Sequence, residues 1–87
     1  MKTYNLKPYN LIPRYDGRKS FYGKAMVIER GDEIILVSYD TEVAYIKDSQ
    51  PYVRDAYSHT TLRHIKEFLK QHGFKAESKY QILRDYI

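Results

Sequence analysis

The chain has 87 residues with a net charge of +4, and it contains no cysteine. A chain of this length forms one domain with a small core, so we predict a single domain over residues 1–87. The absence of cysteine excludes disulfides and thiolate metal sites. No apolar run approaches the roughly 20 residues of a membrane span, and the N-terminus lacks the apolar segment of a signal peptide. These features predict a cytoplasmic protein that does not enter a membrane.

The N-terminal segment, residues 1–22, is basic and shows no clear periodicity. Pro8 and Pro13 interrupt any helix there, so we predict an irregular arm. Residues 1–24 carry six Lys or Arg and one Asp, whereas residues 25–57 carry three basic and seven acidic residues. An arm with this excess of positive charge is suited to contact an anionic partner.

Residues 23–57 predict an antiparallel β-meander of three to four strands, because turn signals recur about every nine residues. The expected strands are 24–30, 33–39, 42–47 and a short fourth at 52–57. Gly31-Asp32 predicts a two-residue hairpin, and a further turn is expected at Asp40-Thr41. The second strand is apolar on both faces, which predicts a central position. We expect a helix on one of its faces and the N-terminal arm on the other.

Residues 58–87 predict two helices. Leu62, Ile65, Phe68 and Leu69 recur at helical spacing, and Gly73 is placed to end this main helix. A short helix follows, begun by a capping box at Ser78. The predicted fold class is therefore α+β, an antiparallel three- to four-stranded meander sheet with one main C-terminal helix packed on it, a short terminal helix and an irregular N-terminal arm. The solvent-facing side of the main helix is expected to carry Arg63, Lys66, Glu67 and Lys70.

Basic and aromatic residues alternate in the stretch "RYDGRKSFYGKA", residues 14–25. Lys and Arg neutralise phosphates, and aromatic rings stack on bases. The basic face of the main helix can extend the same surface. The residues predicted to bind nucleic acid or another partner are Arg14, Tyr15, Arg18, Lys19, Phe21, Tyr22, Lys24, Arg63, Lys66 and Lys70. The blander interpretation is that this stretch begins a strand, with Phe21 in the core and the charges in solvent.

The histidines give no convincing catalytic or metal-binding pattern. His59 and His64 are five residues apart, not the four that places two ligands on one helical face. His72 falls within the apolar stripe of the main helix, where a packing role is expected. Asp55 and His59 form only a weak acid–base spacing, and no serine has the context of an activated nucleophile. We therefore predict no catalytic residues, no cofactor and no metal.

Three segments of the chain resemble a family of short uncharacterised proteins encoded by phages and integrative mobile elements of Gram-positive bacteria. These segments are "RKSFYGKA", "SYDTEVAYI" and "TTLRHIKEFLKQHGF", which together span roughly residues 14–74. The resemblance implies a mobile-element origin and no assigned activity. Small proteins of that origin often bind nucleic acid or inhibit host defence. This inference links genomic context to function and does not rest on particular residues.

Three hypotheses follow for the function. The favoured one is a non-enzymatic protein that binds nucleic acid through the basic and aromatic N-terminal segment. The first alternative is a phage-type inhibitor that binds the acidic surface of a host defence nuclease, as anti-CRISPR proteins do. The second is a small ribonuclease toxin, because the main helix faintly resembles the terminal helix of such toxins. Against it, residues 24–57 contain no histidine to act from the sheet.

Overall fold

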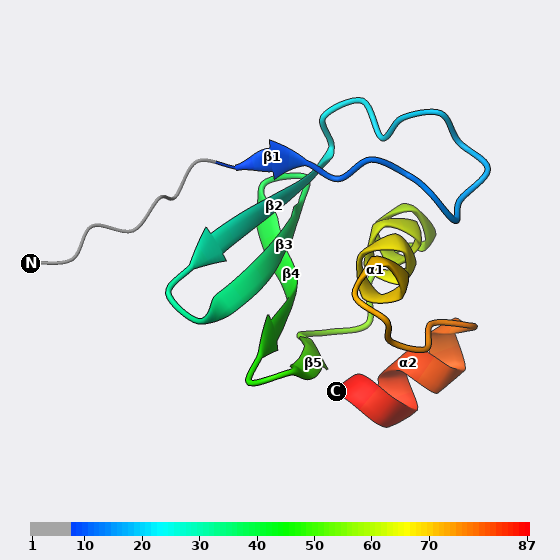
Figure 1. The fold of residues 1–87 in the computed structure, drawn as a ribbon. Coiled ribbons are helices and arrows are strands. Elements are labelled where there is room, and N and C mark those ends of the chain that lie inside the picture. Colours follow the sequence, from blue (N-terminus) through cyan, green and yellow to red (C-terminus); the bar gives the residue numbers. More distant parts are fainter. Residues whose placement is uncertain (1–7) are drawn as a thin grey trace, which may run out of the picture.

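The computed structural model describes residues 8–87, and it confirms an α+β architecture (Figure 1). Five strands form one antiparallel sheet in the order β1-β2-β3-β4-β5. The elements are β1 (Tyr9–Asn10), β2 (Ala25–Arg30), β3 (Glu33–Ser38), β4 (Thr41–Lys47), β5 (Gln50–Val53), α1 (His59–Gln71) and α2 (Lys79–Tyr86). Both helices lie on the same side of the sheet. The first seven residues of the predicted arm lie outside the described residues.

The sheet has more strands than the three to four predicted. The additional strand is β1, in which Tyr9 pairs with Val27 and Asn10 with Met26. Two residues are too few to show the alternation that identifies a strand, so this pairing left no pattern in the sequence. Pro8 directly before it is compatible with an edge strand, where a missing N–H is tolerated.

The hairpin turns explain the other errors in strand position. The turn at Gly31-Asp32 is confirmed, since Arg30 and Glu33 pair across it. The next two turns lie at Tyr39-Asp40 and Asp48-Ser49, and all four of these residues have positive φ. Positive φ at both central residues is typical of a type I′ turn, which Asn and Gly usually form. Neither turn contains Asn or Gly, so the sequence did not mark their positions. The turn predicted at Asp40-Thr41 therefore lies one residue earlier, and the fourth strand predicted at 52–57 instead spans Gln50–Val53.

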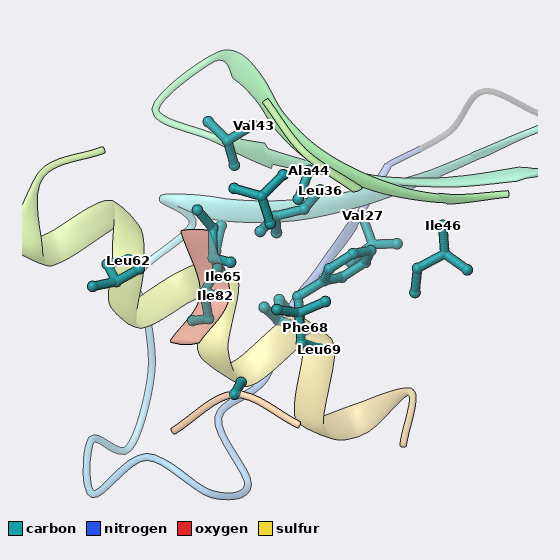
Figure 2. Close-up of a cluster of buried hydrophobic side chains, with 14 of the residues drawn as sticks. Val27, Leu36, Val43, Ala44, Ile46, Leu62, Ile65, Phe68, Leu69 and Ile82 are labelled. Carbon is teal, nitrogen blue, oxygen red and sulfur yellow. The ribbon is translucent and has the colours of Figure 1, made fainter. Parts of the chain in front are cut away.

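The core lies between the sheet and α1, and β3 is central as predicted. Figure 2 shows Leu62, Ile65, Phe68 and Leu69 of α1 directed toward the sheet. The four side chains are buried in one cluster with Val27, Leu36, Val43, Ala44, Ile46, Val53 and Ile82. Leu11 and Phe21 of the arm join this same cluster. The arm therefore packs on the helix side of the sheet, and the expectation that it covers the opposite face is wrong.

The ends of both helices follow their sequence signals. The Ser58 hydroxyl accepts a hydrogen bond from the Thr61 N–H at the start of α1. At its end the Phe74 N–H donates to the Leu69 carbonyl oxygen (2.9 Å), and Gly73 has φ +84°. These are the features of a Schellman ending, in which a left-handed glycine lets the chain turn away. Neither helix in the described part of the chain has the length and apolar composition needed to cross a membrane.

Leu69→Ala is expected to lower the free energy of unfolding by about 2–4 kcal/mol, because truncating a fully buried leucine loses packing and leaves a cavity. Leu69 is completely buried, so the surrounding side chains can fill only part of the cavity that the substitution leaves. Urea denaturation followed by circular dichroism measures the change. Ile12→Ala, at an exposed side chain, is the matched control and should shift stability by less than about 0.5 kcal/mol. Equal effects of the two substitutions would contradict this packing.

Candidate functional site

The arm is fastened to α1 by one buried carboxylate. The side chain of Glu67 is only 1% exposed. Its two oxygens accept hydrogen bonds from the backbone N–H groups of Arg14 (2.8 Å), Tyr15 (3.0 and 3.2 Å) and Asp16 (2.9 Å). The side-chain amide of Gln71 donates a further hydrogen bond to the same carboxylate. A buried charge is costly unless its lone pairs are satisfied, and here N–H donors converge on it from the arm and from α1.

Two neighbours of Glu67 on α1 also hold the arm. Arg63, Glu67 and Gln71 are spaced four residues apart, so they lie along one face of the helix. The Arg63 guanidinium lies 3.4 Å from the Asp16 carboxylate, in an ion pair that is partly buried. The Gln71 side chain also donates to the Ile12 carbonyl oxygen (2.6 Å). The arm thus follows α1 along two turns of helix, as its path in Figure 1 shows.

The expectation that Glu67 lies on the solvent-facing side of α1 is therefore wrong. Glu67 is spaced from Arg63 and Lys70 as residues of a solvent-exposed charged face are. The arm covers part of this face, however, and helical spacing alone cannot show that. Arg63, Lys66 and Lys70 are each half-buried, at the border between the covered part and solvent.

Between the arm and α1 lie three hollows that adjoin at Arg63. The first has a volume of about 310 Å³ and is lined by Tyr15, Asp16, Gly17, His59, Leu62, Arg63 and Lys66. A smaller hollow of about 70 Å³ lies beside it, lined by Tyr15, Asp16, Arg63, Lys66, Glu67 and Lys70. The arm and the helix therefore form one concave basic surface, which we call the arm–helix face.

The remaining hollow on this face lies at the other side of Arg63 and has a volume of about 190 Å³. It is lined by Arg18, Ser20, Phe21, Tyr22, Lys24, Tyr39, Thr60, Arg63 and His64. We call it the Arg63 pocket. Three separate segments contribute to it: the 18–24 segment, the β3–β4 turn and the first half of α1. Its polar groups are cations, hydroxyls and one imidazole.

Most residues predicted to bind a partner meet on the arm–helix face. Those that line the three hollows are Tyr15, Arg18, Phe21, Tyr22, Lys24, Arg63, Lys66 and Lys70. Arg14 and Lys19 are exposed outside the hollows. Phe21 differs from the others because it is only 5% exposed and packs in the core, as the blander interpretation expected. Its ring is therefore not available for stacking, in contrast to Tyr22, which is 76% exposed.

Sequence reasoning missed several residues of the Arg63 pocket. Tyr39 and Thr60 carried only the signals of a strand end and a helix start. His64 was considered only for its spacing from His59, yet it is 2% exposed and packs against the rings of Phe21 and Tyr39. The Nδ1 atom of His64 shares a hydrogen bond with the Ser38 hydroxyl (2.8 Å). These two side chains meet only because α1 packs on β3, a tertiary contact that the sequence pattern does not show.

Ser38 and His64 are not arranged as a nucleophile and its base. The Ser38 hydroxyl is buried and lies between the Thr61 hydroxyl (3.3 Å) and His64 Nδ1 (2.8 Å), so it is engaged within the protein. His72 is half-buried and its Nδ1 contacts the Phe68 carbonyl oxygen (2.8 Å). Within residues 8–87, no group of three or more His, Asp or Glu side chains is placed to hold a metal ion.

Burial lowers the pKa of His64 below its ordinary value of 6.5, because a protonated imidazole loses its hydration inside the protein. Asp16 raises this pKa to a lesser degree, whereas Arg18 and Arg63 lower it further. The neutral ring is therefore the favoured form in the folded protein at neutral pH.

These features define a small α+β protein whose basic arm is bound to its main helix by hydrogen bonds. The chain belongs to a family of unknown function (DUF8033), whose family model matches residues 9–84. The match covers the arm, the sheet and both helices. No curated protein and no solved structure matches the chain.

Glu67→Gln is expected to lower the free energy of unfolding by about 2–4 kcal/mol, because one acceptor oxygen is replaced by an amide that faces backbone N–H groups. Glu77→Gln is the matched control, since Glu77 is exposed and its ion pair with Lys75 is long (3.8 Å). Its effect should stay below about 0.5 kcal/mol. Chemical denaturation measures both, and hydrogen exchange of the Arg14–Asp16 amides should accelerate only in Glu67→Gln. Unchanged exchange at these amides would contradict the attachment.

The lowered pKa of His64 predicts a loss of stability on acidification. Below about pH 6.5 the unfolded chain takes up a proton that the folded protein resists. The free energy of unfolding should therefore be fully retained above pH 6.5 and fall as the pH decreases toward 5. In His64→Gln this dependence between pH 7 and 5 should be smaller, although the variant is less stable overall. Thermal denaturation at several pH values measures it, and parallel curves for the two proteins would refute the assignment to His64.

Proposed function

We propose that this protein is a non-enzymatic binder of single-stranded nucleic acid and that the arm–helix face is its binding surface. The observation that carries the proposal is the attachment of the arm through Glu67. It brings the cations of two segments far apart in the sequence onto one concave face. A positively charged groove with exposed aromatic rings is the common design for binding single strands.

The charge balance of the arm–helix face supports this proposal. Five cations line its hollows, at Arg18, Lys24, Arg63, Lys66 and Lys70. Two carboxylates lie among them, and both are engaged within the protein. Glu67 accepts the backbone N–H groups of the arm, and Asp16 contacts Arg63 and the Arg18 N–H (2.9 Å). The face therefore carries an excess of positive charge suited to a phosphate backbone.

Exposed tyrosine rings add a second feature that single strands recognise. Tyr15 is 62% exposed and Tyr22 is 76% exposed, and both border the hollows. Tyr22 adopts φ +55°, a left-handed conformation that is unfavourable for a bulky residue and directs its ring outward. Unpaired bases stack on such rings, whereas paired bases in a duplex are already stacked on each other.

The biological setting that we propose rests on the sequence resemblance. Similarity to short proteins of phages and integrative mobile elements supports a protein that acts on nucleic acid in the cytoplasm of a bacterial host. An inhibitor of a host nuclease remains the competing function, because exposed tyrosines beside cations are also typical of protein interfaces.

Removing two cations of the arm–helix face should change the salt dependence of binding. In Arg18→Ala/Lys66→Ala, affinity for a fluorescent single-stranded oligonucleotide should fall, and the slope of log K against log salt should flatten by about 1.4 for two lost phosphate contacts. Tyr22→Ala should weaken binding by about 1–3 kcal/mol with little change in slope, because stacking involves no released counterion. Fluorescence anisotropy across a series of salt concentrations measures both quantities.

The control is Lys75→Ala/Lys79→Ala, which removes the same charge at exposed positions beyond the three hollows. Its slope should stay close to that of the unmodified protein. If no oligonucleotide binds, and a host nuclease instead forms a tight complex that Tyr22→Ala disrupts, the inhibitor hypothesis replaces this one. Cleavage of RNA that is abolished by His59→Asn with the fold intact would favour the ribonuclease alternative.

A further inference from the structure

We propose that the Arg63 pocket binds the terminal phosphate of a nucleic-acid strand, so that the protein recognises strand ends. The inference rests on the proposed function, because it names the part of the strand that this pocket receives. The rest of the strand would lie along the remainder of the arm–helix face, past Lys66 and Lys70.

The first observation is the chemistry of the lining. Three cations converge on the pocket from different segments: Arg18 and Lys24 from either side of the 21–24 turn, and Arg63 from α1. The hydroxyls of Ser20, Tyr22, Tyr39 and Thr60 add hydrogen-bond donors. The side chains that line the pocket include no carboxylate. Charge-assisted hydrogen bonds from several cations are the usual means of holding a phosphate.

The second observation is the buried imidazole in the pocket wall. His64 lines the pocket although its side chain is almost completely buried. Its Nδ1 is engaged with Ser38 on the protein side, and its Nε2 has no hydrogen-bond partner among residues 8–87. Ser38 fixes the ring, and the free nitrogen is left for a ligand. The Ser38 hydroxyl has one proton. When this proton is donated to Nδ1 and not to the Thr61 hydroxyl, the neutral imidazole carries its own proton on Nε2 and can donate it to a ligand.

The size of the pocket favours a small charged group. Its volume of about 190 Å³ holds several water molecules but lies below the roughly 300–1,000 Å³ of sites that enclose a drug-sized ligand. A single phosphate group fits within this volume. The rings of Phe21 and His64, in contact at 4.6 Å between centroids, form part of the wall.

The arrangement fits a terminal phosphate better than an internal one. A terminal phosphomonoester carries about −1.5 to −2 charge and presents three acceptor oxygens, whereas an internal phosphodiester carries one charge and continues as chain on both sides. Arg18, Lys24, Arg63 and His64 all line this hollow, and the one carboxylate in contact with them within residues 8–87 is Asp16, which pairs with Arg63 from the neighbouring hollow. This excess of positive charge matches the former. An internal phosphate would instead be expected on an open groove that lets the strand pass in both directions.

Two strained tyrosines border the pocket. Tyr22 and Tyr39 both line it, both are exposed, and both have positive φ (+55° and +50°). Asn or Gly would fit these turns with less strain, so the tyrosines adopt these conformations at an energetic cost. Rings at the rim are placed to stack on the terminal base while its phosphate enters the pocket.

The test compares oligonucleotides of one sequence that end in a 5′-phosphate, a 3′-phosphate or hydroxyls only. Fluorescence anisotropy with the full chain gives the three dissociation constants. We expect one phosphorylated end to bind about tenfold tighter than the hydroxyl-ended strand, which corresponds to about 1.4 kcal/mol. Lys24→Ala should abolish this preference. Inorganic phosphate at millimolar concentration should compete with the phosphorylated strand more effectively than chloride at equal ionic strength.

Lys70→Ala is the matched control, because it removes a cation of the arm–helix face outside the Arg63 pocket. It should weaken all three strands by the same factor and keep the end preference. Tyr39→Phe, which keeps the ring, checks the result independently of any folding defect in Lys24→Ala. Equal affinity for all three strands, or a preference that survives Lys24→Ala and Tyr39→Phe, overturns the inference and leaves the proposed function standing. Absence of binding to every strand overturns both.

Discussion

The carboxylate of Glu67 fixes the path of the arm segment around Arg14, Tyr15 and Asp16. Residues 11–24 contain no helix and no strand, so few contacts of their own define their path. The buried Glu67 side chain supplies the acceptors for three consecutive backbone N–H groups, and Arg63 and Gln71 extend the attachment along α1. Leu11 and Phe21 anchor the segment in the core on either side, and this hydrogen-bonded line fixes the stretch between them against α1, which sets the position of the two hollows beside Tyr15 and Asp16.

The elements with strong periodicity were predictable from the sequence, and those held by single polar contacts were not. The spacing of Leu62, Ile65 and Phe68 predicted α1 and its buried face, and the run of apolar residues from Ile34 predicted the central strand. β1 was not predictable, because two residues show no alternation. The turn at Tyr39 was displaced because a non-glycine residue adopts a left-handed conformation there.

The candidate site was predictable in its composition but not in its shape. Charge counting located the basic arm, and helical spacing located the cations of α1. Neither could show that Glu67 faces inward, because the partners of that carboxylate are backbone amides, which every residue type except proline provides. For the same reason Tyr39 and His64 were absent from the predicted set. They reach the Arg63 pocket through the β3–β4 turn and through contacts between α1 and β3, both of which are tertiary features.

Because the arm is attached through its backbone, the attachment does not depend on which side chains it carries. Glu67 binds the N–H groups of Arg14, Tyr15 and Asp16 and makes no demand on the side chains of the first two. Substitutions at those two positions can alter the binding surface without releasing the arm, provided that proline is avoided. The structure thus separates the backbone groups that fix the position of the arm from the side chains that it presents to solvent.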